Sequence, residues 1–253
     1  MKYLVQTNNI TEEKSKIVDW DRVIVDTTDN SVYTIKGDGY NLIDLGLPSG
    51  TLWMDRNIGA KKIEDYGLYF AWGETQGYTA DEVGKTKQFD WSDYKYANGA
   101  CNKLTKYCSE SSFGNEGYTD NLTELELSDD AAYAYTNGKC NMPTYEQIHE
   151  LDDFTDMIFT TKDNVEGTLV VSKVNNNTMF LPHAGVYYNG TQHKGFKGYS
   201  MHWSTYFTRD KTNNVYGWLL RTDKSVNNGA FVIDSSCDEY DRCFGCSIRG
   251  VKI

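Results

Sequence analysis

The 253-residue sequence has little proline, little histidine and no excess of basic charge. It contains 3 Pro and 4 His, and 25 Lys plus Arg stand against 36 Asp plus Glu, which gives a net charge of −11. Because an acidic surface repels a phosphate backbone, we expect no nucleic-acid partner. No apolar run reaches the roughly 18 residues of a membrane-spanning helix, so we expect no membrane insertion. The first twenty residues also lack the apolar segment of a signal peptide, which predicts that the chain is not exported by one of its own.

The six cysteines do not follow the spacing of a metal site. Cys243 and Cys246 are the only closely spaced pair, and Cys237 lies upstream of them. A tetrahedral zinc site would require a second pair, or histidines at ligand spacing, and the four histidines do not provide them. The sequence therefore predicts free thiols, no bound metal and no cofactor.

Aromatic residues are abundant, with 19 Tyr and 6 Trp, and 22 Gly accompany them. This composition is typical of a folded, loop-rich protein, and the length suits one large domain with a small appendage. Residues 1–40 form the predicted appendage, with short β-branched runs at Tyr3–Val5, Val23–Val25 and Val32–Ile35. The turn residues Asp29–Ser31 predict a hairpin between the last two runs. Such small strands bury little by themselves, so we interpret residues 1–40 as an anchor that docks on something larger.

Residues 41–253 read as one domain with two helices followed by short strands. The first helix is expected within residues 122–135, and the second follows Thr144, where Thr144 and Gln147 form a capping-box pattern. Thr168–Ser172 and Thr178–Leu181 flank three asparagines and predict a β-hairpin. Further strands are expected at residues 186–188, 215–220, 230–233 and 247–251. This order predicts an α+β fold of short antiparallel strands.

A series of motifs in this domain resembles a known family. The motifs are DLGLPSGTLW (44–53), NIGA (57–60), YGLYFAWGET (66–75), DDAA (129–132), MPT (142–144), FLPHAG (180–185), WST (203–205) and GCSIRGV (245–251). In this order they are similar to the Fibrobacter succinogenes major paralogous domain, over about residues 42–253. The resemblance implies a C-type-lectin-like fold, related to the formylglycine-generating-enzyme group, in which a constant scaffold carries a variable binding face.

Two departures from the family pattern stand near the carboxy-terminal end. Gly198–Thr205 has extra residues before Trp203, which predicts a changed loop at the binding face, and Gly250 stands where the family usually has proline. Most motif residues also have a structural explanation. We expect the tryptophans and glycines of the motifs to serve the core and tight turns, namely Trp53, Trp72, Trp203, Gly46, Gly59, Gly73 and Gly185.

The sequence provides little support for an enzyme. Cys243 and Cys246 do not match the motif of the cysteine-oxidising relatives, and no nucleophile elbow, phosphate loop or His-Glu-x-x-His motif occurs. Asp129 and Asp130 could be an acid pair, but carboxylates are also favoured at the start of a helix. The acidic residues between 234 and 241 do not have the spacing of a calcium loop. We therefore expect no catalytic residues.

Two unmatched segments mix tyrosine and arginine with small polar residues, a composition enriched in contact surfaces. An ordinary surface would have the same composition, and both interpretations stay open at this point. Residues 234–244 are interpreted as a loop between two strands, and residues 199–206 as a second such loop. The predicted ligand-binding residues are Tyr199, Met201, His202, Tyr206, Asp238, Glu239, Tyr240, Arg242 and Phe244.

These features together suggest a non-enzymatic phage virion protein. A domain that resembles adhesins and has no export signal fits a head or tail fibre, or a decoration protein, that is assembled in the host cytoplasm and released by lysis. Residues 1–40 would contact other virion proteins, the main domain would bind a host-surface glycan or protein, and we expect a homo-oligomer. The alternatives are a bacterial cell-surface adhesin or lipoprotein of the same family and, less favoured, a formylglycine-generating-type enzyme.

Overall fold

The computed structural model describes residues 2–4, 17–19, 32–34, 40–120, 122, 124–193, 198–206, 216–227 and 230–252. Of residues 2–4, 17–19, 32–34, 224–227 and 230–239 it describes the backbone alone. In chain order the elements are β1 (Lys2–Leu4), β2 (Ile17–Asp19), β3 (Val32–Thr34), β4 (Asn41–Asp44), β5 (Leu52–Met54), the 3₁₀ turns η2 (Asn115–Gly117) and η3 (Leu127–Asp129), α1 (Ala131–Tyr135), α2 (Tyr145–Phe154), β6 (Thr155–Lys162), β7 (Val165–Ser172), β8 (Thr178–Pro182), β9 (Tyr187–Tyr188), β10 (Thr191–Gln192), β11 (Tyr199–Trp203), β12 (Tyr216–Asn227), β13 (Ala230–Asp241) and β14 (Val251–Lys252).

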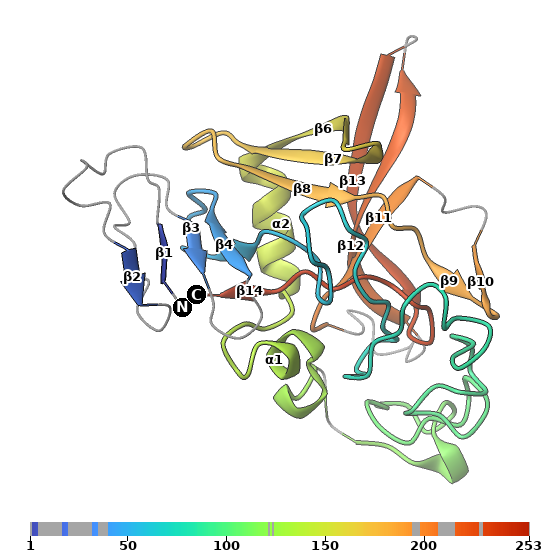
Figure 1. Cartoon of the computed structure of the whole chain (residues 1–253). Helices are drawn as coiled ribbons and strands as arrows, with labels where there is room; N and C mark the ends of the chain where they lie inside the picture. The colour runs from blue at the N-terminus through green and yellow to red at the C-terminus, as the bar shows by residue number, and fades with distance from the viewer. Residues whose placement is uncertain are drawn as a thin grey trace.

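The strands form small antiparallel sheets, and the few helices are short, so the chain has an α+β fold as predicted. The largest sheet has the order β14-β5-β4-β3, and two three-stranded sheets have the orders β6-β7-β8 and β11-β12-β13. Two two-stranded ribbons, β1-β2 and β9-β10, complete the described sheets. Figure 1 shows the long β12–β13 ribbon extending beyond the other elements.

Two hydrophobic clusters hold these sheets together. The smaller cluster joins Trp53 of β5 to Ile148 and Leu151 of α2, and to Leu181 of β8 and Leu220 of β12. The larger cluster lies around Trp72 and Trp203, among many buried aromatic rings. All three of these tryptophans are completely buried, which confirms that they serve the core. The glycines predicted in tight turns have positive φ angles, and at Gly59 (φ 80°) a Cβ atom would lie 2.4 Å from Leu68 Cγ.

The short-range signals of the sequence are confirmed. Thr144 accepts a hydrogen bond from the Gln147 backbone amide at 3.2 Å, and the Gln147 side chain accepts one from the Thr144 amide at 2.9 Å. This capping box begins α2. β7 and β8 form the predicted hairpin, and Asn176 adopts a positive φ of 61° in its turn.

The first predicted helix is shorter than expected. Residues 122–135 contain only the turn η3 and the five-residue helix α1. Asp130 has an extended backbone, and its carboxylate caps the amide of Tyr133, so the helix begins only at Ala131. Upstream, the amide of Leu125 donates to the carbonyl of Thr205, because this segment lies extended beside the end of β11.

Both segments predicted as binding loops are largely strands, and the loop prediction was wrong for them. β13 continues to Asp241 and pairs with β12 along its whole length, while Tyr199–Trp203 forms β11 on the other side of β12. The backbone hydrogen bonds of this sheet outweigh the polar composition that suggested loops.

In the predicted anchor, β1 pairs with β2, whereas β3 pairs with β4 and so extends the four-stranded sheet of the main domain. The expected strand Val23–Val25 lies outside the described residues.

Candidate functional site

The sheet β11-β12-β13 brings aromatic side chains onto one face. In antiparallel strands, directly paired residues project from the same side of the sheet. Tyr199 pairs with Asp223, and Tyr240 pairs with Gly217, which lies on the same side of β12 as Arg221 and Asp223. At one end of this side Trp203 and Leu219 are buried in the core, and at the other end Tyr199 and Arg221 are half-buried.

Five half-buried side chains form a continuous row, which we call the aromatic face: Tyr188, Tyr199, Arg221, Tyr240 and Phe244. The ring centroids of Tyr188 and Phe244 are 4.6 Å apart, and those of Phe244 and Tyr240 are 6.3 Å apart. The Arg221 guanidinium lies 5.6 Å from the centroid of the Tyr199 ring. Its Nη1 donates a long hydrogen bond of 3.5 Å to the Tyr240 hydroxyl. Arg221 therefore links Tyr199 to the other three aromatic side chains of the row.

The carboxylate of Asp223 forms an ion pair with Arg221. This carboxylate lies 3.5 Å from Nη2 of Arg221, and Asp223 is nearly buried. Burial raises the pKa of the Tyr199 hydroxyl, and the nearby Asp223 carboxylate raises it further. Both effects keep Tyr199 uncharged.

Phe244 is held in position by the chain on both sides of it. Its amide closes a turn on the carbonyl of Asp241, and the next residue, Gly245, exchanges two backbone hydrogen bonds with Tyr187. Arg242 is completely buried, donates from Nη1 to the Tyr107 carbonyl at 3.1 Å, and lies 5.5 Å from the Trp72 ring centroid. Phe244 is therefore held in place by a hydrogen-bonded turn and by buried neighbouring residues, and it does not belong to a free loop.

The structure separates the predicted binding residues into three groups. Tyr199, Tyr240 and Phe244 meet in the aromatic face. Met201, His202 and Arg242 are completely buried in the core, and they have no exposed surface for a ligand.

The other predicted residues lie apart from the aromatic face or beyond the described side chains. Tyr206 packs near Tyr145 of α2, with ring centroids 6.4 Å apart. The backbones of Asp238 and Glu239 pair with Leu219 and Trp218, and the side chains of these two acidic residues lie outside the described part of the chain.

Sequence reasoning missed Tyr188 and Arg221. Tyr188 was included in a predicted strand, and Arg221 directly follows one, but nothing in either segment indicates contact with Tyr240 or Phe244. Only the pairing of β12 with β13, and of residue 187 with residue 245, brings them together.

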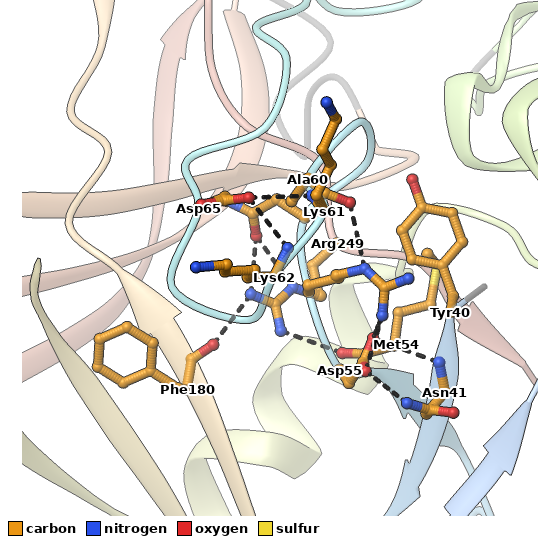
Figure 2. A network of polar contacts seen from close by, with 12 residues as sticks. Tyr40, Asn41, Met54, Asp55, Ala60, Lys61, Lys62, Asp65, Phe180 and Arg249 are labelled. Atoms are coloured by element: carbon orange, nitrogen blue, oxygen red, sulfur yellow. Dashed lines mark hydrogen bonds and ion pairs between the residues drawn. The ribbon is translucent and has the colours of Figure 1, made fainter. Parts of the chain in front are cut away.

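Figure 2 shows a polar network around Arg249, which bonds to Met54 and Phe180. The Oδ1 atom of Asn57 accepts hydrogen bonds from Nε and Nη2 of Arg249, at 3.0 and 2.8 Å. It also lies 2.9 Å from Nε2 of His202, which must donate because an amide oxygen only accepts. Arg249 donates further to the carbonyls of Met54 and Phe180, both at 3.0 Å.

The network contains a charged group and is completely buried around Arg249, His202 and Asn57. Arg249 and His202 are completely buried, and burial lowers the pKa of Arg249 to about 9 and that of His202 well below its usual range. Nearby, Nη1 of Arg56 donates to both carboxylate oxygens of Asp55, with both distances 2.9 Å. These contacts fix the position of β11 relative to residues 54–57, and so they stabilise the support of the aromatic face.

The thiols of Cys243 and Cys246 are also completely buried. Burial raises the pKa of both groups far above its usual range, so both are protonated thiols at neutral pH. A nucleophilic cysteine requires the thiolate form. Among the described residues, no group of three or more His, Cys, Asp or Glu is arranged to hold a metal ion.

A groove of about 440 Å³ lies between the η3–α2 region and β14. Three of its polar side chains, those of Asp130, Thr144 and Gln147, have structural roles. The carboxylate of Asp130 accepts from the amides of Tyr133 and Met142, at 2.9 and 2.8 Å, while Gln147 completes the capping box and donates to Thr51. The aromatic face, in contrast, consists of large side chains that pack against the core and remain partly exposed.

The chain was compared with protein-family models, with curated proteins and with solved structures, and none of them matches it. In the described part of the chain, none of the helices has the length and apolar character needed to cross a membrane.

Proposed function

We propose that this chain is a non-enzymatic binding module of a phage virion, a head or tail fibre or a decoration protein, that contacts the host surface through the aromatic face. The proposal includes a C-type-lectin-like scaffold, which the motif resemblance to the Fibrobacter succinogenes major paralogous domain family implies. The observation that carries it is the row of half-buried aromatic rings that Arg221 joins, next to completely buried residues such as Arg242.

The composition and rigidity of this row favour binding. Tyrosine, phenylalanine and arginine are enriched where proteins contact ligands, since they provide large apolar area together with polar groups. Phe244 and Tyr240 are fixed by the sheet and by the turn after β13, so they lose little conformational freedom when a ligand arrives. The buried, protonated thiols of Cys243 and Cys246 favour binding over chemistry.

In this proposal, residues 1–40 contact other virion proteins and further copies of the chain complete the particle-attached assembly. The pairing of β3 with β4 gives the anchor a backbone connection to the main domain. A second candidate, a bacterial surface adhesin of the same family, would use the same aromatic face and differs only in where the protein is displayed.

Electron microscopy of purified phage particles, labelled with an antibody against residues 42–253, tests the proposal. We expect label on the head or the tail of the particle. Label on the host envelope and none on particles would replace the virion assignment with the adhesin.

A binding assay with the purified full chain and host cells tests the aromatic face itself. The Phe244→Ala variant should bind host cells at least about tenfold more weakly than the wild type, because it loses the ring that contacts both Tyr188 and Tyr240. Tyr118→Ala is the matched control, since Tyr118 is exposed and its ring lies outside the aromatic face. Equal loss in both variants would contradict the assignment.

A further inference from the structure

We propose that the aromatic face recognises a neutral oligosaccharide chain, an inference that rests on the binding role proposed above. A sugar ring has an apolar face of C–H groups and an edge of hydroxyl groups. The aromatic face offers matching partners for both, namely the rings of Tyr188, Phe244 and Tyr240, and the polar groups of Arg221 and Tyr199.

The charges around the row disfavour an anionic ligand. Arg221 is the cation of the aromatic face, and the Asp223 carboxylate 3.5 Å away already neutralises it. At the other end of the row, Asp241 and Asp90 lie close enough to Tyr188 to raise the pKa of its hydroxyl, in addition to the larger effect of burial. A uronic or sialic acid would meet these carboxyl groups without a free positive partner in the row.

A cationic ligand is disfavoured by Arg221 itself. Quaternary ammonium groups bind in cages of aromatic rings, where the ring faces attract positive charge. Between Tyr199 and Tyr240 the Arg221 guanidinium already occupies this position, because it lies over the Tyr199 ring and donates to the Tyr240 hydroxyl. A second cation would be repelled, so a neutral ligand remains.

The size of the row favours a short glycan segment over a protein partner. A stable protein–protein interface buries about 800 Å² on each partner and uses roughly 20–30 residues a side. Among the side chains that the structure describes, the aromatic face comprises five. A few sugar units can cover such a row, while the hydroxyl of Tyr240 and the guanidinium of Arg221 bond to the sugar edges.

The test uses surface polysaccharide extracted from the host bacterium and divided into neutral and acidic fractions by anion exchange. Binding of the full chain to each fraction is measured by biolayer interferometry. We expect binding to the neutral fraction, a loss of at least about tenfold in Phe244→Ala, near-normal binding in Phe244→Tyr, and no change in the Tyr118→Ala control. Thermal unfolding of each variant checks that the fold is retained.

Treatment of the host cells separates this inference from the proposed function. Periodate, which cleaves vicinal diols of sugars, should abolish binding of the chain to cells, and protease should leave it intact. Protease-sensitive, periodate-resistant binding, or binding to the acidic fraction alone, would overturn the neutral-glycan inference while the binding role stands. Failure to bind untreated host cells would overturn both.

Discussion

Replacing Asn57 with alanine should destabilise the fold strongly, although the residue lies far from any surface. Its Oδ1 atom accepts two hydrogen bonds from Arg249 and one from His202, and its amide nitrogen donates to the Tyr66 carbonyl at 3.0 Å. Hydrogen bonds to a charged group contribute about 1.5–3 kcal/mol each. Since Arg249 keeps its bonds to two backbone carbonyls, we expect the free energy of unfolding to fall by about 4 kcal/mol rather than more.

Urea unfolding of Asn57→Ala, Arg249→Met and the double variant measures this contribution. In the Arg249→Met background the buried cation is gone, so Asn57→Ala should cost only about 1–2 kcal/mol for the bonds to His202 and Tyr66. The difference is a coupling energy of about 2–3 kcal/mol between the two residues. If the two single losses add to within about 0.5 kcal/mol, the hydrogen bonds to Asn57 do not stabilise the buried guanidinium and the reasoning fails.

Two further predictions concern pH and helix capping. Burial lowers the pKa of His202 well below its usual range. Below pH about 6.5 the unfolded chain therefore binds a proton at His202 that the folded chain does not bind, and the free energy of unfolding should fall on acidification. Burial also raises the pKa of Asp130 to about 6. Between pH about 6 and 4 the folded chain therefore binds a proton at Asp130 that the unfolded chain does not bind, so acidification raises the free energy of unfolding through Asp130 and opposes the histidine effect. In Asp130→Asn the histidine effect should therefore appear alone, and the free energy of unfolding, measured with urea, should fall by about 1.4 kcal/mol per pH unit in this window. A slope equal to that of the wild type would contradict this prediction. Thr144→Ala, which removes the hydroxyl that accepts from the Gln147 amide, should cost about 1 kcal/mol and lower the Tm by about 2–4 °C, whereas Thr161→Ala, at an exposed threonine, should leave it unchanged.

The parts of the fold that depend on short-range contacts could be predicted from the sequence. The pattern Thr144-x-x-Gln147 identifies the start of α2, because both capping bonds lie within four residues. The β7–β8 hairpin is indicated by strands on either side of an asparagine turn. Trp53, Trp72 and Trp203 are large and apolar, and each is completely buried as expected.

The strand β13 could not be predicted in the same way. Its residues from Asp234 to Asp241 are polar on both sides of the alternation, which is typical of a loop. They form a strand because β12 supplies hydrogen-bonding partners along the whole segment, and that partner is recognised only from the three-dimensional pairing.

The candidate site was predicted in part, for the same reason. Composition identified Tyr199, Tyr240 and Phe244, but it could not separate outward side chains from inward ones without the register of the strands. His202, three residues after the half-buried Tyr199 in β11, is completely buried and bonds to Asn57. Arg221 joins the row because β12 lies between β11 and β13.

The pairing of β14 with β5 has a consequence for how the chain folds during synthesis. Val251 pairs with Trp53 and also exchanges two backbone hydrogen bonds with Asn141, while Arg249 bonds to residues 54, 57 and 180. The contacts of residues 249 and 251 with residues 53–57 join segments almost two hundred residues apart, and contacts of such sequence separation form slowly. Residues 40–245 are therefore synthesised before their four-stranded sheet and their buried arginine network can close, and we expect the domain to complete its fold only after residues 246–252 have left the ribosome.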